Sequence, residues 1–247
     1  MITLSIIIPV LNEARTLGET LSSLPRHPEA EVIVVDGGST DQTLPAAGRF
    51  PEAKVMVAPR GRGSQMNAGA LAASGELLVF LHADTLLTGE HLRALRTAAA
   101  DPDFAAGAFE LILTPPLPAL RFIAWGANRR TRFLGLPYGD QVLTIRRALF
   151  MALGGFAHRR PEDLDLVLRL KGRARLRMLQ PPVASSGRRW LEGGYLRTTL
   201  SNWVFLARHL AERLFTSRWP EKGDLDGGGE GGQGTQTPAP SPTPLNG

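Results

Sequence analysis

Residues 31–43 read EVIVVDGGSTDQT, an apolar run that ends on an Asp and continues through two glycines and two hydroxyl residues. The run Glu31–Asp36 has the length and the β-branched content of a buried strand. Ser39, Thr40 and Asp41 are typical of a helix start, because hydroxyls and carboxylates pair with free backbone N–H groups. The stretch therefore predicts a strand, a glycine turn and a helix in succession.

The same alternation of strand and helix continues on both sides of this stretch. Further strands are expected over Thr3–Val10, Ala53–Ala58 and Glu76–Leu81, and helices over Ala14–Leu24, from Asp41, over Ser64–Ala73 and over Gly89–Ala100. Such alternation predicts an α/β fold with a mostly parallel, doubly wound sheet and right-handed crossovers. Sheets of this kind bind ligands at the carboxyl ends of their strands, so the site is expected there.

The second half of the chain is less regular. Strands are expected over Phe104–Leu113, Val142–Arg146 and Ala174–Leu179, and helices over Leu117–Phe133, Ala148–Leu153, Pro161–Lys171 and Tyr195–Phe215. From Gly223 the chain is rich in Gly and then in Thr and Pro. Such a composition buries too little apolar surface to offset its ordering entropy, which predicts a disordered tail over 223–247.

Composition narrows the class of protein. The 247 residues include no Cys, which excludes disulfides and thiolate metal sites. The net charge is +5, and all but three of the 28 bases are Arg; this bias either suits phosphate binding or reflects an Arg-biased genome. The sequence contains no basic stripe with interleaved aromatic residues, the pattern typical of nucleic-acid binding, so we expect no nucleic-acid partner. Without a signal peptide or an apolar run of about 20 residues, we expect a cytoplasmic protein, soluble or peripheral to a membrane.

Polar residues follow the first two expected strands. A turn has no evident need of an Asp directly after VIVV, so Asp36 is a candidate for hydrogen bonding to a ribose or a base. Gly37 beside it permits close approach of a ligand. In PVLNE (residues 9–13), Asn12 either caps the next helix or faces the ligand. Glu13 either complements the helix dipole or meets the ligand.

Two further strand ends carry residues suited to phosphates and cations. In RGRGSQMN (residues 60–67), two arginines and the N–H groups of a helix start predict an anion site, with a solvated basic turn as the alternative. In HADT (residues 82–85), the Asp84 carboxylate could hold a hard cation that bridges phosphates, or it could cap a turn. His82 is either a second ligand or a core residue.

Three stretches of the second half add candidates. In PEDLD (residues 161–165), acids suit the first turn of a helix, but a carboxylate there could also act as a general base. In GRRW (residues 187–190), paired guanidiniums could hold a diphosphate or lie on the surface. In GDQ (residues 139–141), hydrogen-bonding groups precede a strand, and an ordinary loop is the alternative.

Taken in order, these stretches resemble the family 2 glycosyltransferases of the GT-A fold over Leu4–Trp190. GRGSQMNAGA, FLHADT, YGDQ and SGRRW are also similar to a small glycosyltransferase group described as arsenosugar-biosynthesis or radical-SAM-associated. The resemblance implies a Rossmann-like, mostly parallel sheet with flanking helices in one domain over 1–222. Its half 1–100 would bind the nucleotide sugar, and its half 101–222 would carry the acceptor site and the catalytic base.

The resemblance also implies a nucleotide-diphosphate sugar donor, a divalent cation (Mn or Mg) and an acceptor hydroxyl on a lipid or a small molecule. It matches Asp163, beside Glu162, to the catalytic base, and Asp84 to the last Asp of the D-x-D metal motif. His82 stands at the first Asp position, so one carboxylate is missing. The donor site would be lined by Pro9, Asn12, Glu13, Asp36, Gly37, Arg60, Arg62, Gln65, Asn67, His82, Asp140, Arg188, Arg189 and Trp190.

The expected reaction is inverting sugar transfer, with two alternatives. A non-catalytic nucleotide-sugar-binding or scaffold protein could use the same fold. A sugar nucleotidyltransferase would carry a Gly-rich loop after the first strand, and PVLNEART lacks one. The basic amphipathic stretches Leu117–Phe133 and Tyr195–Phe215 face either the core or a membrane surface, which would suit a lipid acceptor.

Overall fold

The computed structural model describes residues 2–25, 30–157, 162–201, 204 and 207. The chain divides into two compact units, Met1–Leu206 and Ala207–Gly247, and every element below belongs to the first. The expected tail over 223–247 and residues 208–215 of the expected helix Tyr195–Phe215 lie outside the described residues. No helix in the described ranges is long and apolar enough to cross a membrane.

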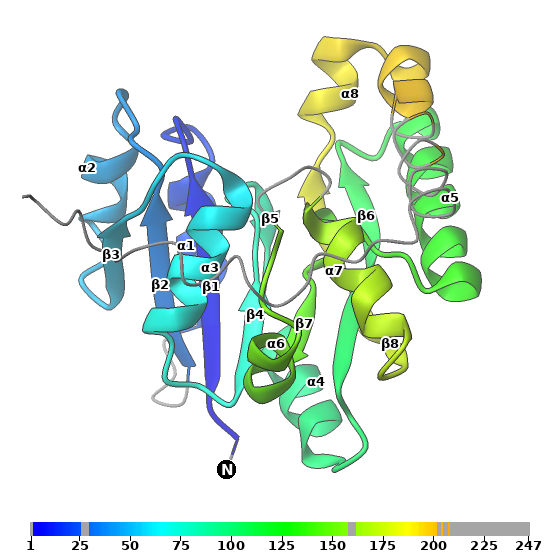
Figure 1. Ribbon diagram of the computed structural model, residues 1–247. Helices are drawn as coiled ribbons and strands as arrows, with labels where there is room; N and C mark the ends of the chain where they lie inside the picture. Colours follow the sequence, from blue (N-terminus) through cyan, green and yellow to red (C-terminus); the bar gives the residue numbers. More distant parts are fainter. Residues whose placement is uncertain (1, 26–29, 158–161, 202–203, 205–206, 208–247) are drawn as a thin grey trace, which may run out of the picture. The chain divides into compact units, whose positions relative to one another are not determined.

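The strands form one eight-stranded sheet in the order β3-β2-β1-β4-β7-β6-β8-β5 within the described residues. Their bounds are β1 Leu4–Val10, β2 Ala30–Asp36, β3 Ala53–Val57, β4 Leu77–Phe80, β5 Thr85–Leu86, β6 Ala106–Thr114, β7 Thr144–Arg146 and β8 Leu176–Ser186. The strands β3, β2, β1 and β4 are parallel, and β7 runs antiparallel to β4 and β6. The expected mostly parallel α/β sheet is confirmed (Figure 1).

Helices occupy most of the connections between strands. Their bounds are α1 Leu17–Ser23, α2 Thr43–Ala47, α3 Arg62–Ala72, α4 Gly89–Ala100, α5 Pro118–Leu134, α6 Arg147–Ala152, α7 Glu162–Lys171 and α8 Arg188–Gly193, with the short 3₁₀ turn η1 Gly139–Gln141. Residues 195–201 are also helical. In α5 a Pro stands in the first turn, and Gly135 ends the helix in the left-handed conformation (φ 59°), as the sequence favours.

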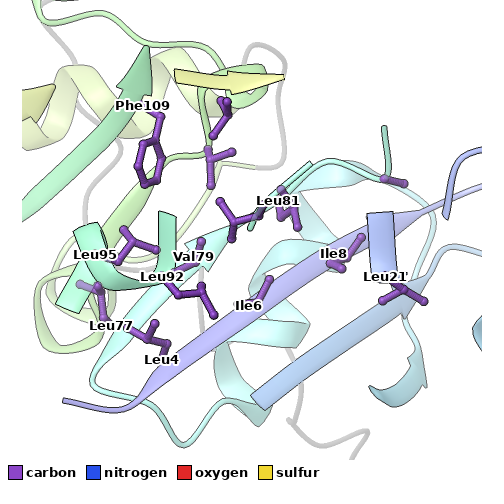
Figure 2. Packing of buried hydrophobic residues seen from close by; sticks show 14 of the residues in the cluster. Leu4, Ile6, Ile8, Leu21, Leu77, Val79, Leu81, Leu92, Leu95 and Phe109 are labelled. Carbon is purple, nitrogen blue, oxygen red and sulfur yellow. The ribbon is translucent and has the colours of Figure 1, made fainter. Parts of the chain in front are cut away.

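The central strand β1 is buried on both faces, which is why its apolar run is continuous. Ile6 and Ile8 point to the side where Leu92 of α4 also packs (Figure 2). Ile7 points to the opposite side, toward α3. A Cβ at Gly69 would lie only 2.5 Å from the Cγ2 atom of Ile7, so this Gly permits α3 to approach the sheet.

Most of the expected bounds lie within two residues of the observed ones, and two differ by more; β5, α8 and η1 were not expected. The first helix is expected from Ala14, but α1 begins at Leu17. The carbonyl of Glu13 accepts the N–H groups of Thr16 (3.1 Å) and Leu17 (3.0 Å), and the N–H of Ala14 donates to the Asp41 carboxylate (3.3 Å). These bonds occupy backbone N–H groups of the loop after β1, so the helix starts only at Leu17.

The strand β8 is longer than expected. The expected strand ends at Leu179, whereas β8 continues to Ser186 through Pro181 and Pro182, residues that usually stop a strand. The pairing of β8 with β6 shifts register after Phe109, and the partner on its other side, β5, is two residues long and pairs only later in β8. The prolines therefore lie at an irregularity where the ladder requires few donors.

His91 links α4 to β8 and supplies a test of pH dependence. It is 6% exposed; its Nδ1 accepts the N–H of Thr88 (3.0 Å), so its Nε2 carries the proton and donates to the Pro182 carbonyl (3.1 Å). Burial is the main cause that lowers the pKa of His91. The folded state therefore keeps a neutral ring while the unfolded chain takes up a proton near pH ~6.5, and stability is lost as the pH falls below that value.

We expect the free energy of unfolding to fall more steeply from about pH 7 to about pH 5 in the wild type than in His91→Asn, which cannot titrate. Urea denaturation at each pH measures both slopes. Other titrating groups contribute equally to the two proteins, so the difference isolates His91. Equal slopes would show that this side chain does not control the acid limb of stability.

Candidate active site

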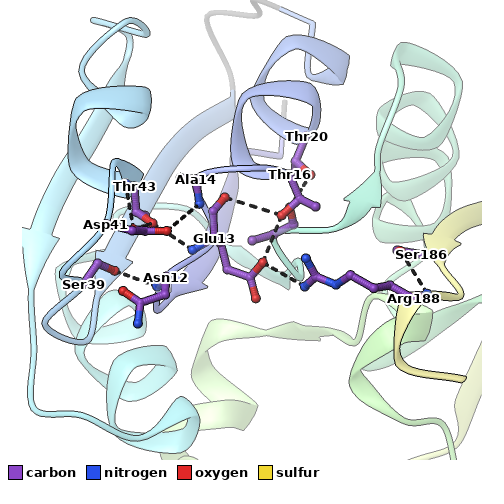
Figure 3. Close-up of polar contacts among 11 residues, drawn as sticks. Asn12, Glu13, Ala14, Thr16, Thr20, Ser39, Asp41, Thr43, Ser186 and Arg188 are labelled. Carbon is purple, nitrogen blue, oxygen red and sulfur yellow. Dashed lines mark hydrogen bonds and ion pairs between the residues drawn. The ribbon is translucent and has the colours of Figure 1, made fainter. Parts of the chain in front are cut away.

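The loops after β1 and β2 are joined by side-chain hydrogen bonds (Figure 3). The N–H of Thr40 donates to Asn12 Oδ1 (2.8 Å), and the N–H of Asn12 donates to Ser39 Oγ (2.9 Å). The N–H of Glu13 donates to Thr43 Oγ1 (2.8 Å). Asn12 adopts φ 57°, a left-handed conformation that Asn tolerates. Its amide thus fastens the second loop, and the alternative that Asn12 caps the next helix is wrong.

Asp36 closes the turn after β2. It is 1% exposed, and its carboxylate accepts the N–H groups of Gly38 and Ser39 (2.9 Å each) and the Ser39 hydroxyl. The premise that this turn has no need of an Asp is therefore wrong, because the side chain satisfies two backbone donors. Contact between Asp36 and a nucleoside stays a prediction. Asp41 accepts the N–H of Thr43 (2.9 Å), which confirms its expected role at a helix start.

Two amides expected near the donor hold the framework of the site. Gln65 is 3% exposed, and its Nε2 donates to the carbonyls of Val10 and Val35 (2.8 Å each), the ends of β1 and β2. A Cβ at Gly37 would lie 2.9 Å from Gln65 Oε1, so packing accounts for that Gly. Asn67 pairs through both ends of its amide with the backbone of Phe156 (2.8 and 2.9 Å). Direct contact of these residues with a donor is untested.

Arg62 connects the start of α3 to the first two residues of α7. Its Nε donates to Glu162 Oε1 (2.6 Å) and its Nη2 to Asp163 Oδ2 (2.8 Å). The two acids are 3% and 6% exposed, and the Arg62 side chain is 40% exposed. Burial opposes the charged guanidinium, but Asp163 and Glu162 outweigh it and raise the pKa of Arg62. The sequence places Arg62 among phosphate ligands, whereas the structure brings it to the expected catalytic carboxylates.

The guanidinium of Arg62 and the carboxyl groups of its two acidic partners lie beside His82, just after the end of β4, and near the turn η1. His82 Nε2 is 3.4 Å from Arg62 Nη1; burial, and next the charge of Arg62, lower the pKa of His82 to about 3, so its ring is neutral. A Cβ at Gly139 would lie 2.3 Å from His82 Nε2 and 2.8 Å from Asp163 Oδ2. The backbone of η1 therefore packs directly on both side chains. In the sequence, GDQ attracts attention only through its hydrogen-bonding groups, so the need for a Gly at position 139 was not predicted.

The substitution Gly139→Ala tests this packing. The added methyl must displace His82 or Asp163, so we expect turnover to fall at least about tenfold, as small misplacements of catalytic groups do. Gly126→Ala in α5 is the matched control, because a Cβ there meets nothing within 4 Å; it should keep activity and gain about 0.5–1 kcal/mol of stability. Steady-state turnover and thermal unfolding measure both effects. Unchanged turnover in Gly139→Ala would contradict the proposed crowding.

Asp84 lies in an acidic environment. Burial, then the nearby charge of Glu13, with a further contribution from Asp140, raise the pKa of Asp84 to about 6, although Arg188 opposes them. Burial also raises the pKa of Asp140, whose Oδ1 is buried without a hydrogen-bond partner. Within the described ranges, no group of three or more His, Asp or Glu side chains is arranged to hold a metal ion. A cation here would take most of its ligands from a substrate.

The start of α8 brings two arginines near Asp84 and Asp140. The Arg188 guanidinium donates to Glu13 Oε2 (3.2 Å), which joins residues 175 positions apart (Figure 3). The charge of Arg189 acts on Asp140. Trp190 is 7% exposed and packs with Leu120 in a small apolar cluster, so its ring belongs to the core.

The remaining predicted donor residues have simpler positions. Pro9 lies within β1, opposite Val35 of β2, and is partly buried. Arg60 is exposed in the loop that precedes α3. The structure thus brings eight charged side chains and the neutral ring of His82 into one network, here the charged network: Glu13, Arg62, Asp84, Asp140, Glu162, Asp163, Arg188 and Arg189. It leaves Gln65, Asn67 and Trp190 with framework contacts.

Comparison with known proteins adds a family and a fold. The family model described as glycosyl transferase family 2 matches residues 5–157. An uncharacterized glycosyltransferase of Nostoc sp. is 35% identical over 89 residues, which are 33% of this chain and 28% of that protein. The chain therefore matches less than a third of the length of this curated relative.

Solved structures agree on the architecture. The mannosyltransferase PcManGT from Pyrobaculum calidifontis, in complex with GDP-Man and Mn²⁺, has a TM-score of 0.65 at 22% identity, over 89% of this chain and 66% of that one. S. aureus TarS 1–349 has a TM-score of 0.61 at 20% identity, over 74% and 60%. The glucosyl-3-phosphoglycerate synthase from Mycobacterium tuberculosis, with Mn²⁺, UDP and glucosyl-3-phosphoglycerate, has 0.59 at 20%, over 78% and 75%. The expected GT-A fold is confirmed.

Proposed function

Since this chain belongs to glycosyl transferase family 2, we propose that it transfers a sugar from a nucleotide-diphosphate donor to an acceptor hydroxyl. The observation that carries the proposal is the pairing of Arg62 with Glu162 and Asp163 beside the charged surroundings of Asp84. Structures of similar fold were solved with GDP-Man, UDP-GlcNAc or UDP, which supports a donor of this class.

Asp163 is the proposed general base. Its Oδ2 is held by Arg62, which leaves Oδ1 to accept the proton of the acceptor hydroxyl. As that proton leaves, the acceptor oxygen bonds to the anomeric carbon, the bond from this carbon to the phosphate oxygen breaks, and the nucleoside diphosphate departs. Attack opposite the leaving group inverts the anomeric configuration. Asp163 lies in the first turn of α7.

Asp84 is the proposed protein ligand of a divalent cation, Mn²⁺ or Mg²⁺. The site fits such an ion: Asp84, Glu13 and Asp140 concentrate negative charge, and Asp140 Oδ1 is buried without a partner. When bound, the cation neutralises charge that develops on the departing diphosphate. With one D-x-D carboxylate replaced by His82, the diphosphate must supply a large share of the ligands. Several structures of similar fold contain Mn²⁺ or Mg²⁺.

The donor is proposed to lie along the joined loops after β1 and β2. Pro9, Asn12, Asp36 and Gly37 would border the nucleoside, and Arg60, Arg188 and Arg189 would lie near the phosphates. Gln65 supports this region through the ends of β1 and β2, and Asn67 through the backbone of Phe156. Trp190 would contribute through the position of α8, since its ring is buried.

Finer identities stay predictions. Membership in the arsenosugar or radical-SAM-associated group, a cytoplasmic location, the division into a donor half 1–100 and an acceptor half 101–222, and a lipid or small-molecule acceptor all rest on the sequence. The held pair of carboxylates favours the enzyme over a non-catalytic binder. The loop after β1, which is tied by Asn12 and contains no Gly, argues against a nucleotidyltransferase.

A thermal-shift panel of UDP-, GDP- and TDP-sugars, each with and without Mn²⁺ or Mg²⁺, tests the proposal. A donor that binds only the folded state adds about 2.7 kcal/mol of stability at 100 times its Kd, so one base should raise Tm clearly. The cation should increase that shift in the wild type but not in Asp84→Asn. Absence of any shift across the panel would contradict donor binding.

A further inference from the structure

The helix α5 presents an aromatic face to solvent. Phe122, Trp125 and Phe133 are 70%, 53% and 70% exposed. The rings of Phe122 and Trp125 stack with centroids 5.6 Å apart, and the guanidinium of Arg129 lies over Trp125 (4.9 Å) and Phe133 (5.8 Å). These four residues, here the α5 aromatic stripe, follow one another at three- or four-residue spacing and share one side of the helix.

The stripe is not the side by which α5 packs on the domain. The buried residues of α5 are Leu120, Ala124 and Thr131. Leu120 and Ala124 contact Trp190 in a cluster that covers the end of β6. Core-facing amphipathicity accounts for these residues, but it leaves the stripe unexplained. Large exposed apolar patches of this kind mark interaction surfaces.

The helix after Gly194 exposes a second apolar row. Leu196, Leu200 and Val204, at four-residue spacing, are 88%, 65% and 58% exposed. This helix meets α5 through Tyr195, which packs on the cluster that contains Leu120 (Figure 1). Two neighbouring helices, far apart in the sequence, therefore both expose large apolar side chains.

Charge identifies the partner. The sequence of α5 holds four Arg residues and no Asp or Glu. Arg121 and Arg129 are exposed within or beside the stripe. A second copy that docked by the same face would bring two cationic helices together, which is unfavourable. An anionic lipid surface, in contrast, attracts the guanidiniums and accepts Trp and Phe rings at the level of the headgroups.

We propose that α5 and the helix after Gly194 dock the protein on an anionic bilayer, with Phe122, Trp125 and Phe133 inserted at the boundary of headgroups and acyl chains. The docking requires neither the donor nor the reaction, so it can be tested separately from the proposed function. Binding should require both the apolar contact and the positive charge, and should weaken as the salt concentration rises.

The absence of Cys in the chain permits a direct test. A polarity-sensitive fluorophore is attached to Phe122→Cys and, as the control, to Leu71→Cys in α3, a position of similar exposure (71%). Vesicles of phosphatidylcholine with phosphatidylglycerol should shift the emission of the label at position 122 to the blue and leave the emission at position 71 unchanged. Vesicles of pure phosphatidylcholine should shift the emission at position 122 only slightly. A label at 122 that is already in an apolar environment without vesicles would overturn the proposal, because the chain or a second copy would then cover the stripe.

Vesicle flotation of the full, unlabelled chain gives the second readout. Trp125→Glu should reduce the bound fraction about tenfold, because it removes an inserted ring and adds a repelled charge, whereas Leu71→Glu should leave binding unchanged. Failure of the wild type to float with anionic vesicles would overturn the proposal, as would equal losses in the two variants. Trp125→Glu should unfold on heating in a cooperative transition like that of the wild type, which shows that it folds.

Discussion

Replacement of Asp163 by Asn will lower turnover by about 10²–10⁴-fold, the range typical for loss of a general base. The amide keeps the size of the side chain, and its oxygen can still accept a hydrogen bond from Arg62, but it cannot take the proton of the acceptor. Donor binding should therefore change little. Nucleoside diphosphate release at saturating donor measures turnover, and the thermal shift caused by the donor measures binding.

Asp165→Asn is the matched control for Asp163→Asn. Asp165 lies two residues further along α7. Its Oδ2 pairs with Arg169 Nη2 (2.7 Å) and not with Arg62. Its replacement should keep turnover near that of the wild type, since no reacting atom depends on it. If Asp163→Asn kept near-normal turnover with bound donor, the base would have to be another group and the proposed mechanism would be wrong.

Arg62→Gln will impair both stability and turnover. It leaves Glu162 and Asp163 buried without their ion-pair partner, and removal of one partner from a buried pair typically costs 3–5 kcal/mol. Because the Arg62 side chain is 40% exposed, solvent screening reduces the expected loss to about 1–2 kcal/mol. The carboxyl group of Asp163 also loses its fixed orientation, so turnover should fall at least about tenfold even at saturating donor.

The comparison of Arg62→Gln with Arg62→Lys and Arg60→Gln separates the roles of this side chain. Lys restores the charge but not the planar fork that reaches two carboxylates, so it should recover stability more than turnover. Arg60→Gln, in the exposed loop before α3, should keep the stability of the wild type and alter only the KM for the donor. If the only effect of Arg62→Gln were a rise in the KM for the donor, Arg62 would bind phosphate, as the sequence predicts, and would not position the carboxylates.

The sheet could be predicted from the sequence because its signals are local. Runs such as Val32–Val35 are β-branched and apolar at every position, as strands buried on both faces require. The bounds of Gly89–Ala100 match α4 as expected, since Thr88 and Asp101 flank an amphipathic pattern. Strand ends then indicated where polar side chains gather, which located Glu13, Arg62, His82 and Asp84.

Contacts between distant residues could not be predicted in this way. Arg62 sits in a glycine-rich helix start, and that local pattern favours phosphate binding. Its actual partners lie about 100 positions away, and only the packing of α3 near α7 brings them within 2.8 Å. The pair of Glu13 and Arg188 has the same origin.

Asp36 shows the opposite error. Its carboxylate bonds within three residues, so a local explanation existed. A strand end with two following glycines suits a ligand equally well, so the residue types favour neither use of the Asp. Which of the two uses applies depends on the backbone conformation of the turn, which the residue types leave open.

A chain that transfers sugar from a nucleotide-diphosphate donor must release nucleoside diphosphate. This release is measured for the UDP-, GDP- and TDP-sugar panel, with the cation present or chelated. We expect release from donors of one base, dependent on the cation and nearly abolished in Asp163→Asn. Release from none of these donors, or equal release by the wild type and Asp163→Asn, would contradict the proposed transfer.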